Sequence, residues 1–319
     1  MVKNQIFDEI GQAVEVALPA YQSTKSTLSG TKIRVDEISQ ITTISRGSSS
    51  CATDFLAQLL VTSDFAIRAL DPALFYEENK PIIGLNELVI ALSQSGETGE
   101  VVNALKFASK KTANTFAIHN SKNSTLSNSA FWDLFINAGI EKSVPATKSV
   151  IAQLCSILAI YDWLTQSNNE AQIDRYVSLL PNILLQSREH EIDPYKVHAV
   201  LGTNTAIPIA KEIALKMTEL WGTPIWGGNA LEFLHGPIAI TREQNSLIYV
   251  GDFTKETLEP LKTKVAQRNL KILQSPQITN QISDLLLTLS YWQQISATSA
   301  IKIGVDPTNP FGLTKVTQT

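Results

Sequence analysis

The feature that most constrains the fold is an apolar run that ends in a polar, glycine-containing turn. Residues 88–92 read Leu-Val-Ile-Ala-Leu, and residues 93–100 read Ser-Gln-Ser-Gly-Glu-Thr-Gly-Glu. A short apolar run bounded by turn residues is typical of a fully buried strand in a parallel sheet. Apolar residues follow the turn at roughly helical spacing, namely Val101, Val102, Leu105 and Phe107. The pattern therefore predicts a strand, a turn and the beginning of a helix.

The beginning of this helix is a candidate anion site. A helix N-terminus presents unpaired backbone N–H groups and the positive end of the helix dipole. The hydroxyls of Ser93, Ser95 and Thr98 could add hydrogen bonds to the oxygens of an anion. The turn contains neither a lysine nor a Walker pattern, so a small phosphate ester fits better than a nucleotide-hydrolysing P-loop. A helix capped by Ser or Thr without any ligand fits the pattern equally well.

The composition excludes several other classes of protein. The chain has 319 residues, which is enough for about two domains, and 44% of them are hydrophobic and 18% charged. These values indicate a sizeable core and argue against disorder. The net charge is −4 and no basic run stands out, which argues against nucleic acid or an anionic membrane as a partner.

Neither the cysteines nor the histidines form a recognisable ligand set. Cys51 and Cys155 are the only cysteines, so the sequence contains no disulfide framework and no thiolate zinc site. The four histidines are too scattered for a metal cluster. The N-terminus lacks the core of a signal peptide, and the apolar helix expected over 150–164 is shorter than the ~20 residues that span a bilayer. We therefore expect a soluble, cytoplasmic protein.

The strand-turn-helix pattern recurs, which predicts an α/β fold with parallel sheets. In the first half we expect strands at 41–44, 88–92, 116–119 and 132–136. In the second half we expect strands at 197–201, 246–251, 270–273 and 285–289, and a helix over 291–303. Gly47 and Gly202 occupy matching places after the first strand of each half, 155 residues apart (202 − 47). Two copies of one α/β unit are the simplest explanation.

The predicted domains follow from this repeat. Residues 1–30 are expected to form an N-terminal helix and connector, residues 31–165 a first domain, residues 175–305 a second domain, and residues 306–319 a C-terminal tail. The polar stretch 165–174 lacks apolar periodicity and is the predicted linker. A helix is expected over 180–186, with Pro181 in its first turn, where proline is best tolerated.

A row of charged residues marks the first helix of the second half. Glu212, Lys216 and Glu219 are spaced to lie on one side of a helix, separate from its apolar face. Such a row is ordinarily a solvated face with an i,i+4 ion pair. The sequence that follows is unusual, because residues 220–228 form a Gly- and Trp-rich segment, predicted as a loop, and residues 232–237 read Glu-Phe-Leu-His-Gly-Pro.

Six segments together resemble the sugar isomerase (SIS) family. They are Arg-Gly-Ser-Ser at 46–49, Ser-Gln-Ser-Gly-Glu-Thr at 93–98, Glu-Lys-Ser-Val-Pro-Ala-Thr-Lys-Ser at 141–149, Glu-Ile-Ala-Leu-Lys-Met-Thr-Glu at 212–219, Glu-Phe-Leu-His-Gly-Pro at 232–237 and Leu-Thr-Lys-Val-Thr at 313–317. The chain resembles double-SIS proteins related to the isomerase half of glucosamine-6-phosphate synthase, and among them the SIS-type glucosamine-6-phosphate deaminases. The resemblance covers nearly everything from about residue 35 onward. It implies two tandem SIS domains, each a flavodoxin-like three-layer sandwich.

The resemblance also implies which residues bind a phosphosugar. The phosphate of a six-carbon sugar would be bound by Ser49, Ser93, Gln94, Ser95 and Thr98. The sugar itself would be lined by Gly47, Ser48, Val144 and Ala146. This implied phosphate site agrees with the anion site expected from the strand-turn-helix pattern.

Catalytic roles follow from the same resemblance. Glu219 matches the base that moves a proton between the first two carbons, and Lys216 matches a lysine of the same site. His235 matches a ring-opening histidine that the neighbouring subunit supplies, which implies a homodimer. Lys315 matches a lysine of an active-site tail. No metal or organic cofactor is implied, and the expected partner is a small phosphosugar rather than nucleic acid or a membrane.

The expected activity is conversion of glucosamine-6-phosphate to fructose-6-phosphate and ammonia. We expect no glutaminase half, and therefore ammonia release rather than synthesis from glutamine. Two alternatives remain open: the same chemistry on another amino- or fructosamine-6-phosphate, or a regulator that binds a sugar phosphate without turnover. Two departures from the family bear on the substrate, namely the segment 224–228 in place of an Ala-Glu-containing one, and Phe311-Gly312 before the C-terminal Leu-x-Lys.

Overall fold

The computed structural model describes residues 4–78, 80–276 and 279–315. The chain forms two compact units, each built around one parallel sheet. The first-sheet unit contains the described residues of 15–141 and 148–171, and the second-sheet unit those of 1–14, 142–147 and 172–315. The short segment 142–147 thus belongs to the second-sheet unit, although the residues on both sides of it belong to the other.

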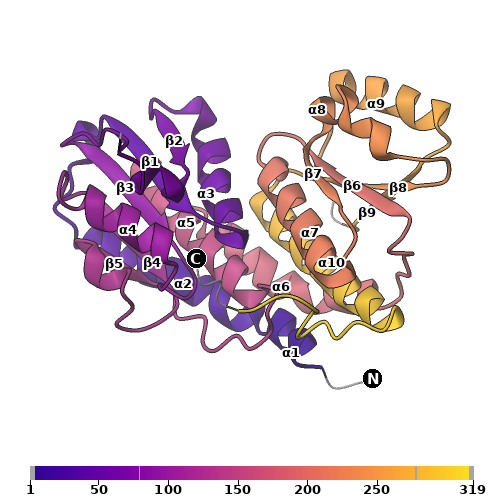
Figure 1. The fold of residues 1–319 in the computed structure, drawn as a ribbon, viewed down its shortest axis with the longest axis horizontal. Helices are drawn as coiled ribbons and strands as arrows, with labels where there is room; N and C mark the ends of the chain where they lie inside the picture. The colour runs from indigo at the N-terminus through magenta and orange to yellow at the C-terminus, as the bar shows by residue number, and fades with distance from the viewer. Residues whose placement is uncertain (1–3, 79, 277–278, 316–319) are drawn as a thin grey trace. The chain divides into compact units, whose positions relative to one another are not determined.

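The first sheet has five parallel strands in the order β2-β1-β3-β4-β5 (Figure 1). Its strands are β1 (Gln40–Ser45), β2 (Ile67–Leu70), β3 (Glu87–Leu92), β4 (Thr115–His119) and β5 (Trp132–Phe135). The helices of this part of the chain are α2 (Ala13–Ser29), α3 (Ser48–Leu59), α4 (Gly99–Ala108) and α5 (Lys148–Thr165). The α/β class and the parallel sheet predicted from the sequence are confirmed.

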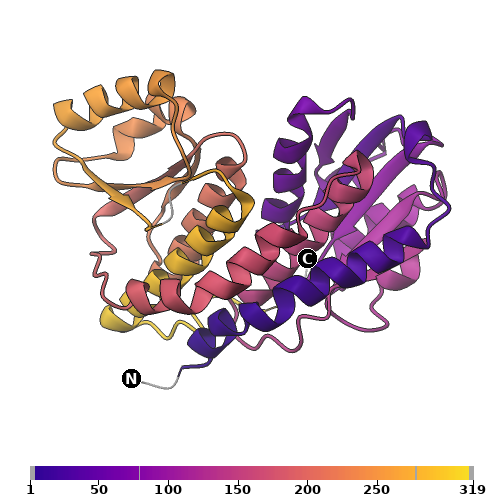
Figure 2. The same ribbon diagram turned by 180° about the vertical axis from the view of Figure 1, so that it is seen from behind.

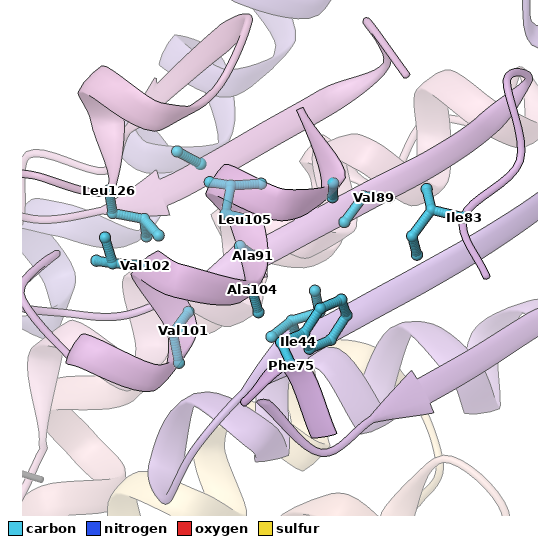
Figure 3. Close-up of a cluster of buried hydrophobic side chains, with 12 residues drawn as sticks. Ile44, Phe75, Ile83, Val89, Ala91, Val101, Val102, Ala104, Leu105 and Leu126 are labelled. Atoms are coloured by element: carbon cyan, nitrogen blue, oxygen red, sulfur yellow. The ribbon is translucent and has the colours of Figure 1, made fainter. Parts of the chain in front are cut away.

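Helices cover both faces of this sheet, because every residue of β3 is buried and alternate side chains point to opposite faces. Val89 and Ala91 of β3 meet Val101 and Leu105 of α4 in one apolar cluster, which Figure 3 shows together with Phe75. On the other side α3 packs against α5. In Figure 2, α5 and α2 lie in front of the strands. Burial of both faces explains why the 88–92 run is continuously apolar.

The second sheet has four parallel strands in the order β7-β6-β8-β9. Its strands are β6 (Val197–Gly202), β7 (Trp226–Asn229), β8 (Ser246–Val250) and β9 (Lys271–Gln274). The helices are α1 (Gln5–Gly11), α6 (Glu170–Ser187), α7 (Ala206–Trp221), α8 (Ala230–Leu234), α9 (Lys255–Gln267) and α10 (Ile282–Lys302). Helices α7 and α10 pack together on one face, and α8 and α9 lie on the other (Figure 1). Short 3-10 turns occupy Val35–Glu37, Leu60–Thr62, Pro72–Phe75, Ser127–Ser129 and Pro237–Ile240.

Two predictions for the second half are wrong. The strand expected at 285–289 lies inside α10, where all five residues are buried. A short apolar run fits a buried helix as well as a buried strand, so periodicity alone could not separate them. The linker expected over 165–174 is shorter than predicted, because α6 already begins at Glu170. Pro181 therefore lies inside a helix, on its exposed side, where water can solvate the carbonyl that the proline leaves unbonded.

Two strands were not predicted. Edge strand β2 has only partly buried residues and no clear alternation. Strand β7 lies in the Gly- and Trp-rich segment that was predicted to be a loop. A Cβ on Gly227 would come within 2.6 Å of the Ala214 Cβ, so glycine allows α7 to pack closely on this strand. Within the part of the chain that the structure describes, no helix has the length and apolar character needed to cross a membrane.

Candidate functional site

Both predicted serine turns lie at the same edge of the first sheet. Strands β1 and β3 are neighbours, and their ends are level because Ser45 pairs with Leu92. The chain leaves β1 toward β2 on one side and leaves β3 toward β4 on the other. In open parallel sheets, ligands bind at such a switch in strand order, beyond the carboxyl ends of the strands. Residues 46–50 and 93–98 occupy this position.

The turn after β3 gathers its hydroxyl groups. Ser93 Oγ lies 2.9 Å from Thr98 Oγ1 and 3.5 Å from Ser95 Oγ. The backbone N–H of Gly96 donates to Ser93 Oγ at 3.3 Å. Gly96 has φ +67°, and a Cβ there would lie 2.3 Å from the Ser124 Oγ. Only glycine permits this turn, and the turn brings together three of the predicted phosphate ligands.

The turn after β1 begins helix α3. Gly47 is its N-cap, with φ +56°, and Ser48 and Ser49 lie in its first turn. The Ser49 side chain is buried and accepts a hydrogen bond from Gln153 Nε2 of α5 at 3.3 Å. Gln94 of the other turn is partly buried, and its backbone carbonyl accepts from Asn120 N at 3.0 Å.

Charged side chains stabilise both turns through ion pairs and hydrogen bonds. Arg46 Nη2 lies 2.7 Å from Asp71 Oδ1 and 2.7 Å from Glu100 Oε2, which links the turn after β1 to the first turn of α4. The Glu97 carboxylate accepts from Thr125 Oγ1 at 2.7 Å and from Thr125 N at 2.8 Å. These two hydrogen bonds lower the pKa of Glu97, because they stabilise its charged form. Arg46 and Glu97 therefore have structural partners within the unit.

Two of the three charged residues in the row on α7 are buried, so the ordinary alternative of a solvated face does not hold. Glu212 and Lys216 are only 1% and 2% exposed, because α10 packs along α7. Lys216 Nζ hydrogen-bonds to Glu219 Oε2 and lies 3.7 Å from Glu212 Oε1. The side chain of Glu219 is 21% exposed. One buried ammonium group thus joins two carboxylates, of which Glu219 is the more accessible to a ligand.

Lys315 and the 142–147 segment meet within the second-sheet unit. Lys315 Nζ donates to the Ser143 carbonyl at 2.6 Å. The backbone N–H of Val144 donates to the Thr308 carbonyl at 2.9 Å. Val144 and Ala146 are both partly exposed, which leaves them accessible to a ligand. The C-terminal segment that the sequence assigned to the active site is therefore bound to the segment predicted to line the sugar.

His235 ends α8 as its C-cap, and its backbone N–H donates to the Glu232 carbonyl at 3.0 Å. Its side chain is exposed. In the described part of the chain, no group of three or more His, Cys, Asp or Glu residues is arranged to hold a metal ion.

The predicted site residues fall into two groups. The first-sheet unit holds Gly47, Ser48, Ser49, Ser93, Gln94, Ser95 and Thr98. The second-sheet unit holds Val144, Ala146, Lys216, Glu219, His235 and Lys315. Within the units, the structure brings together the hydroxyls of the turn after β3, places Lys216 beside Glu219, and bonds Lys315 to Ser143, the residue before Val144.

Sequence reasoning missed two polar residues that support these candidates. The sequence patterns assigned no role to Gln153 or to Glu9. Glu9 is fully buried and accepts hydrogen bonds from the backbone N–H groups of Lys142 at 2.6 Å and Ser143 at 3.1 Å. These contacts join residues more than a hundred positions apart, so no local pattern could have revealed them.

The first sheet and its hydroxyl-lined edge define a doubly wound α/β domain with a candidate ligand site at its switch point. A family model described as SIS domain matches residues 36–161, which include all five strands of this sheet and most of α5. Residues 36–161 of the chain are therefore similar to a SIS domain.

Sequence relatives extend the similarity along the chain. The chain is 30% identical over 279 residues to glutamine–fructose-6-phosphate aminotransferase [isomerizing] of Chlamydia trachomatis, covering 82% of this chain and 45% of that protein. The enzyme of the same name from Campylobacter jejuni is 30% identical over 221 residues, covering 65% of this chain and 36% of that protein. The chain thus spans less than half the length of these curated relatives.

Solved structures share the fold over almost the whole chain. The C-terminal domain of glucosamine-fructose-6-phosphate aminotransferase from Francisella tularensis superimposes with a TM-score of 0.78 at 18% identity, covering 97% of this chain and 98% of that one. Glucosamine-6-phosphate deaminase from Thermotoga maritima gives 0.77 at 18% identity, covering 95% and 98%. Tagatose-6-phosphate ketose/aldose isomerase from Escherichia coli gives 0.78 at 17% identity, covering 97% of both chains.

Proposed function

We propose that the protein is a phosphosugar deaminase/isomerase that converts glucosamine-6-phosphate and water to fructose-6-phosphate and ammonia. The observation that carries this proposal is the buried row on α7, in which Lys216 holds the partly exposed carboxylate of Glu219. A partly exposed carboxylate can reach a substrate proton, as a general base must, and the buried ammonium beside it can stabilise developing negative charge. The relatives named above, whose names include an isomerising aminotransferase and a glucosamine-6-phosphate deaminase, support this class of chemistry.

In the proposed mechanism the first-sheet unit binds the phosphate. The hydroxyls of Ser93, Ser95 and Thr98, together with Ser49 and Gln94, donate hydrogen bonds to its oxygens, and the N-termini of α3 and α4 add a favourable dipole. Gly47 and Ser48 lie beside the sugar in this scheme. Phosphate binding far from the reacting carbons holds the substrate in place, so part of its binding energy supports turnover.

The second-sheet unit is proposed to carry out the chemistry. His235 opens the sugar ring, since an imidazole can act as an acid or a base near neutral pH. Glu219 then removes the proton from C2 and returns it to C1, and a single carboxylate within hydrogen-bond range of both carbons can do so. The ammonium groups of Lys216 and Lys315 stabilise the developing negative charge. The proton transfer leaves an imine at C2, and water releases ammonia from it.

The proposal extends to the assembly and to the second sheet. We propose that the active protein is a homodimer in which His235 reaches the site of the partner subunit, and that the second sheet is a second SIS domain. The exposed position of the His235 side chain is compatible with a role outside its own unit. Hybrid dimers test this directly: mixing inactive His235→Ala with inactive Glu219→Gln restores activity only if a histidine crosses the interface.

The test of the proposed function is a panel of hexosamine-6-phosphates and fructosamine-6-phosphates offered to the purified chain, with ammonia and ketose phosphate both measured. We expect both products from glucosamine-6-phosphate in equal amounts. Ammonia from another amino sugar alone would reassign the substrate. Saturable binding of every sugar without product would overturn the enzymatic proposal in favour of a sugar-phosphate-binding regulator.

A further inference from the structure

The buried carboxylate of Glu9 has no role in the chemistry proposed above. Glu9 lies on helix α1, which belongs to the second-sheet unit, and its side chain is 0% exposed. Oε1 accepts from Lys142 N at 2.6 Å and from Gln5 Nε2 at 3.2 Å, and Oε2 accepts from Ser143 N at 3.1 Å. A buried carboxylate is costly unless it is fully hydrogen-bonded, and here each oxygen receives a backbone N–H.

The two N–H groups belong to the segment that carries Val144 and Ala146. The next peptide unit joins Ser143 to Val144, and both its carbonyl and its N–H bond to the C-terminal segment. Its carbonyl, on Ser143, accepts from Lys315 Nζ at 2.6 Å, and its N–H, on Val144, donates to the Thr308 carbonyl at 2.9 Å. Glu9 therefore holds the Lys142–Ser143 peptide. The next peptide, Ser143–Val144, supplies the carbonyl that accepts the hydrogen bond from the Lys315 ammonium.

Helix α1 also holds the C-terminal segment itself. Asn4, the N-cap of α1, accepts from Thr308 Oγ1 and donates through Nδ2 to Asp306 Oδ1 at 3.3 Å. One short helix thus binds the sugar-lining segment through Glu9 and the lysine-bearing segment through Asn4. The two segments also bind each other, which closes a network around Ser143.

We propose that Glu9 is a positioning residue of the active site. By holding the backbone N–H groups of Lys142 and Ser143, Glu9 determines where the Lys315 amine lies. This inference rests on the proposed function for its catalytic consequence. The carboxylate offers one oxygen to each of the two adjacent backbone N–H groups. A glutamine offers one acceptor and turns an NH₂ group toward the second donor.

The direct test is Glu9→Gln in the full chain, with Asp284→Asn as the matched control. Asp284 is also a buried carboxylate of the second-sheet unit, where it pairs with Arg175 Nη1, and it belongs to none of the contacts described around Ser143. In Glu9→Gln we expect kcat to fall roughly 10- to 100-fold with KM for glucosamine-6-phosphate little changed, since misplacing a reacting group by about 1 Å costs rates of that order. Glu9→Asp keeps a buried carboxylate and is expected to be intermediate.

Two measurements independent of turnover accompany the kinetics. We expect faster hydrogen exchange in peptides covering 141–147, and faster acetylation of Lys315 by acetic anhydride, in Glu9→Gln than in the wild type or in Asp284→Asn. Unchanged exchange and unchanged acetylation in a folded Glu9→Gln or Glu9→Asp would overturn the proposal, as would equal changes in Asp284→Asn. If the wild type turns over no phosphosugar, the proposed function fails, and these two measurements still decide the role of Glu9.

Discussion

Replacing Lys216 by methionine should strongly destabilise the second-sheet unit. The ammonium is 2% exposed and lies between Glu212, itself 1% exposed, and Glu219. Lys216→Met leaves the Glu212 carboxylate buried without the Lys216 ammonium beside it. Breaking a buried ion pair by removing one partner typically costs about 3–5 kcal/mol. Because Glu219 is partly exposed and can be solvated, we assign most of this cost to Glu212.

A second variant separates lost charge from lost packing. The double variant Lys216→Met with Glu212→Gln also removes the carboxylate charge at position 212. Replacing both members of a buried pair by neutral groups is often close to neutral in stability. We therefore expect the double variant to recover about 2 kcal/mol or more of the loss.

The assay is urea unfolding of the full chain followed by tryptophan fluorescence. Trp221 and Trp292 lie on α7 and α10, so their emission reports on the region around the ion pair. Because the chain has two units, the transition of this region is fitted separately from that of the first-sheet unit. A loss below about 1 kcal/mol in Lys216→Met, or a double variant less stable than the single one, would refute the reasoning.

Three further predictions concern the first-sheet unit. Ser93→Ala removes a hydroxyl donor, and a hydrogen bond to a charged group contributes about 1.5–3 kcal/mol. We therefore expect KM for the phosphosugar to rise about 10- to 100-fold while kcat is largely kept. An unchanged KM would exclude Ser93 as a ligand. Gln153→Met removes the donor to Ser49 and should raise KM for glucosamine-6-phosphate but leave binding of unphosphorylated glucosamine unchanged, as calorimetry can show. Glu97 has a depressed pKa from its bonds to Thr125, so its contribution to stability is present above its unfolded pKa and is lost as the pH falls through its folded pKa. Unfolding experiments should therefore show that Glu97→Gln lowers stability at neutral pH and that the difference from wild type disappears in acid; a pH-independent difference would contradict this.

Local sequence patterns were sufficient to predict the structure at the switch-point edge of the first sheet. The run at 88–92, the glycine at 96 and the helical spacing after it each determine structure within a few residues, so β3, the turn and α4 were all predicted. The edge strands β2 and β7 were missed because one has only partly buried residues and the other contains two glycines.

Long-range packing explains what the sequence could not reveal. The row from Glu212 to Glu219 has the spacing of a solvated helix face, and only the packing of α10 on α7 makes it buried. Residues 285–289 were predicted as a strand for a similar reason, because their apolar run does not show that the helix continues to Lys302. Glu9 contacts residues 133 and 134 positions away, so its role depends on the tertiary fold alone.

The central claim is that Glu219 carries the substrate proton between two carbons. The most direct measurement follows glucosamine-6-phosphate labelled with deuterium at C2, with product formation and the fate of the label recorded together by NMR. The wild type should move the label to C1 of the ketose or release it to solvent, whereas Glu219→Gln should bind the sugar and leave the label at C2. Loss of the C2 label at the wild-type rate in Glu219→Gln would contradict the account.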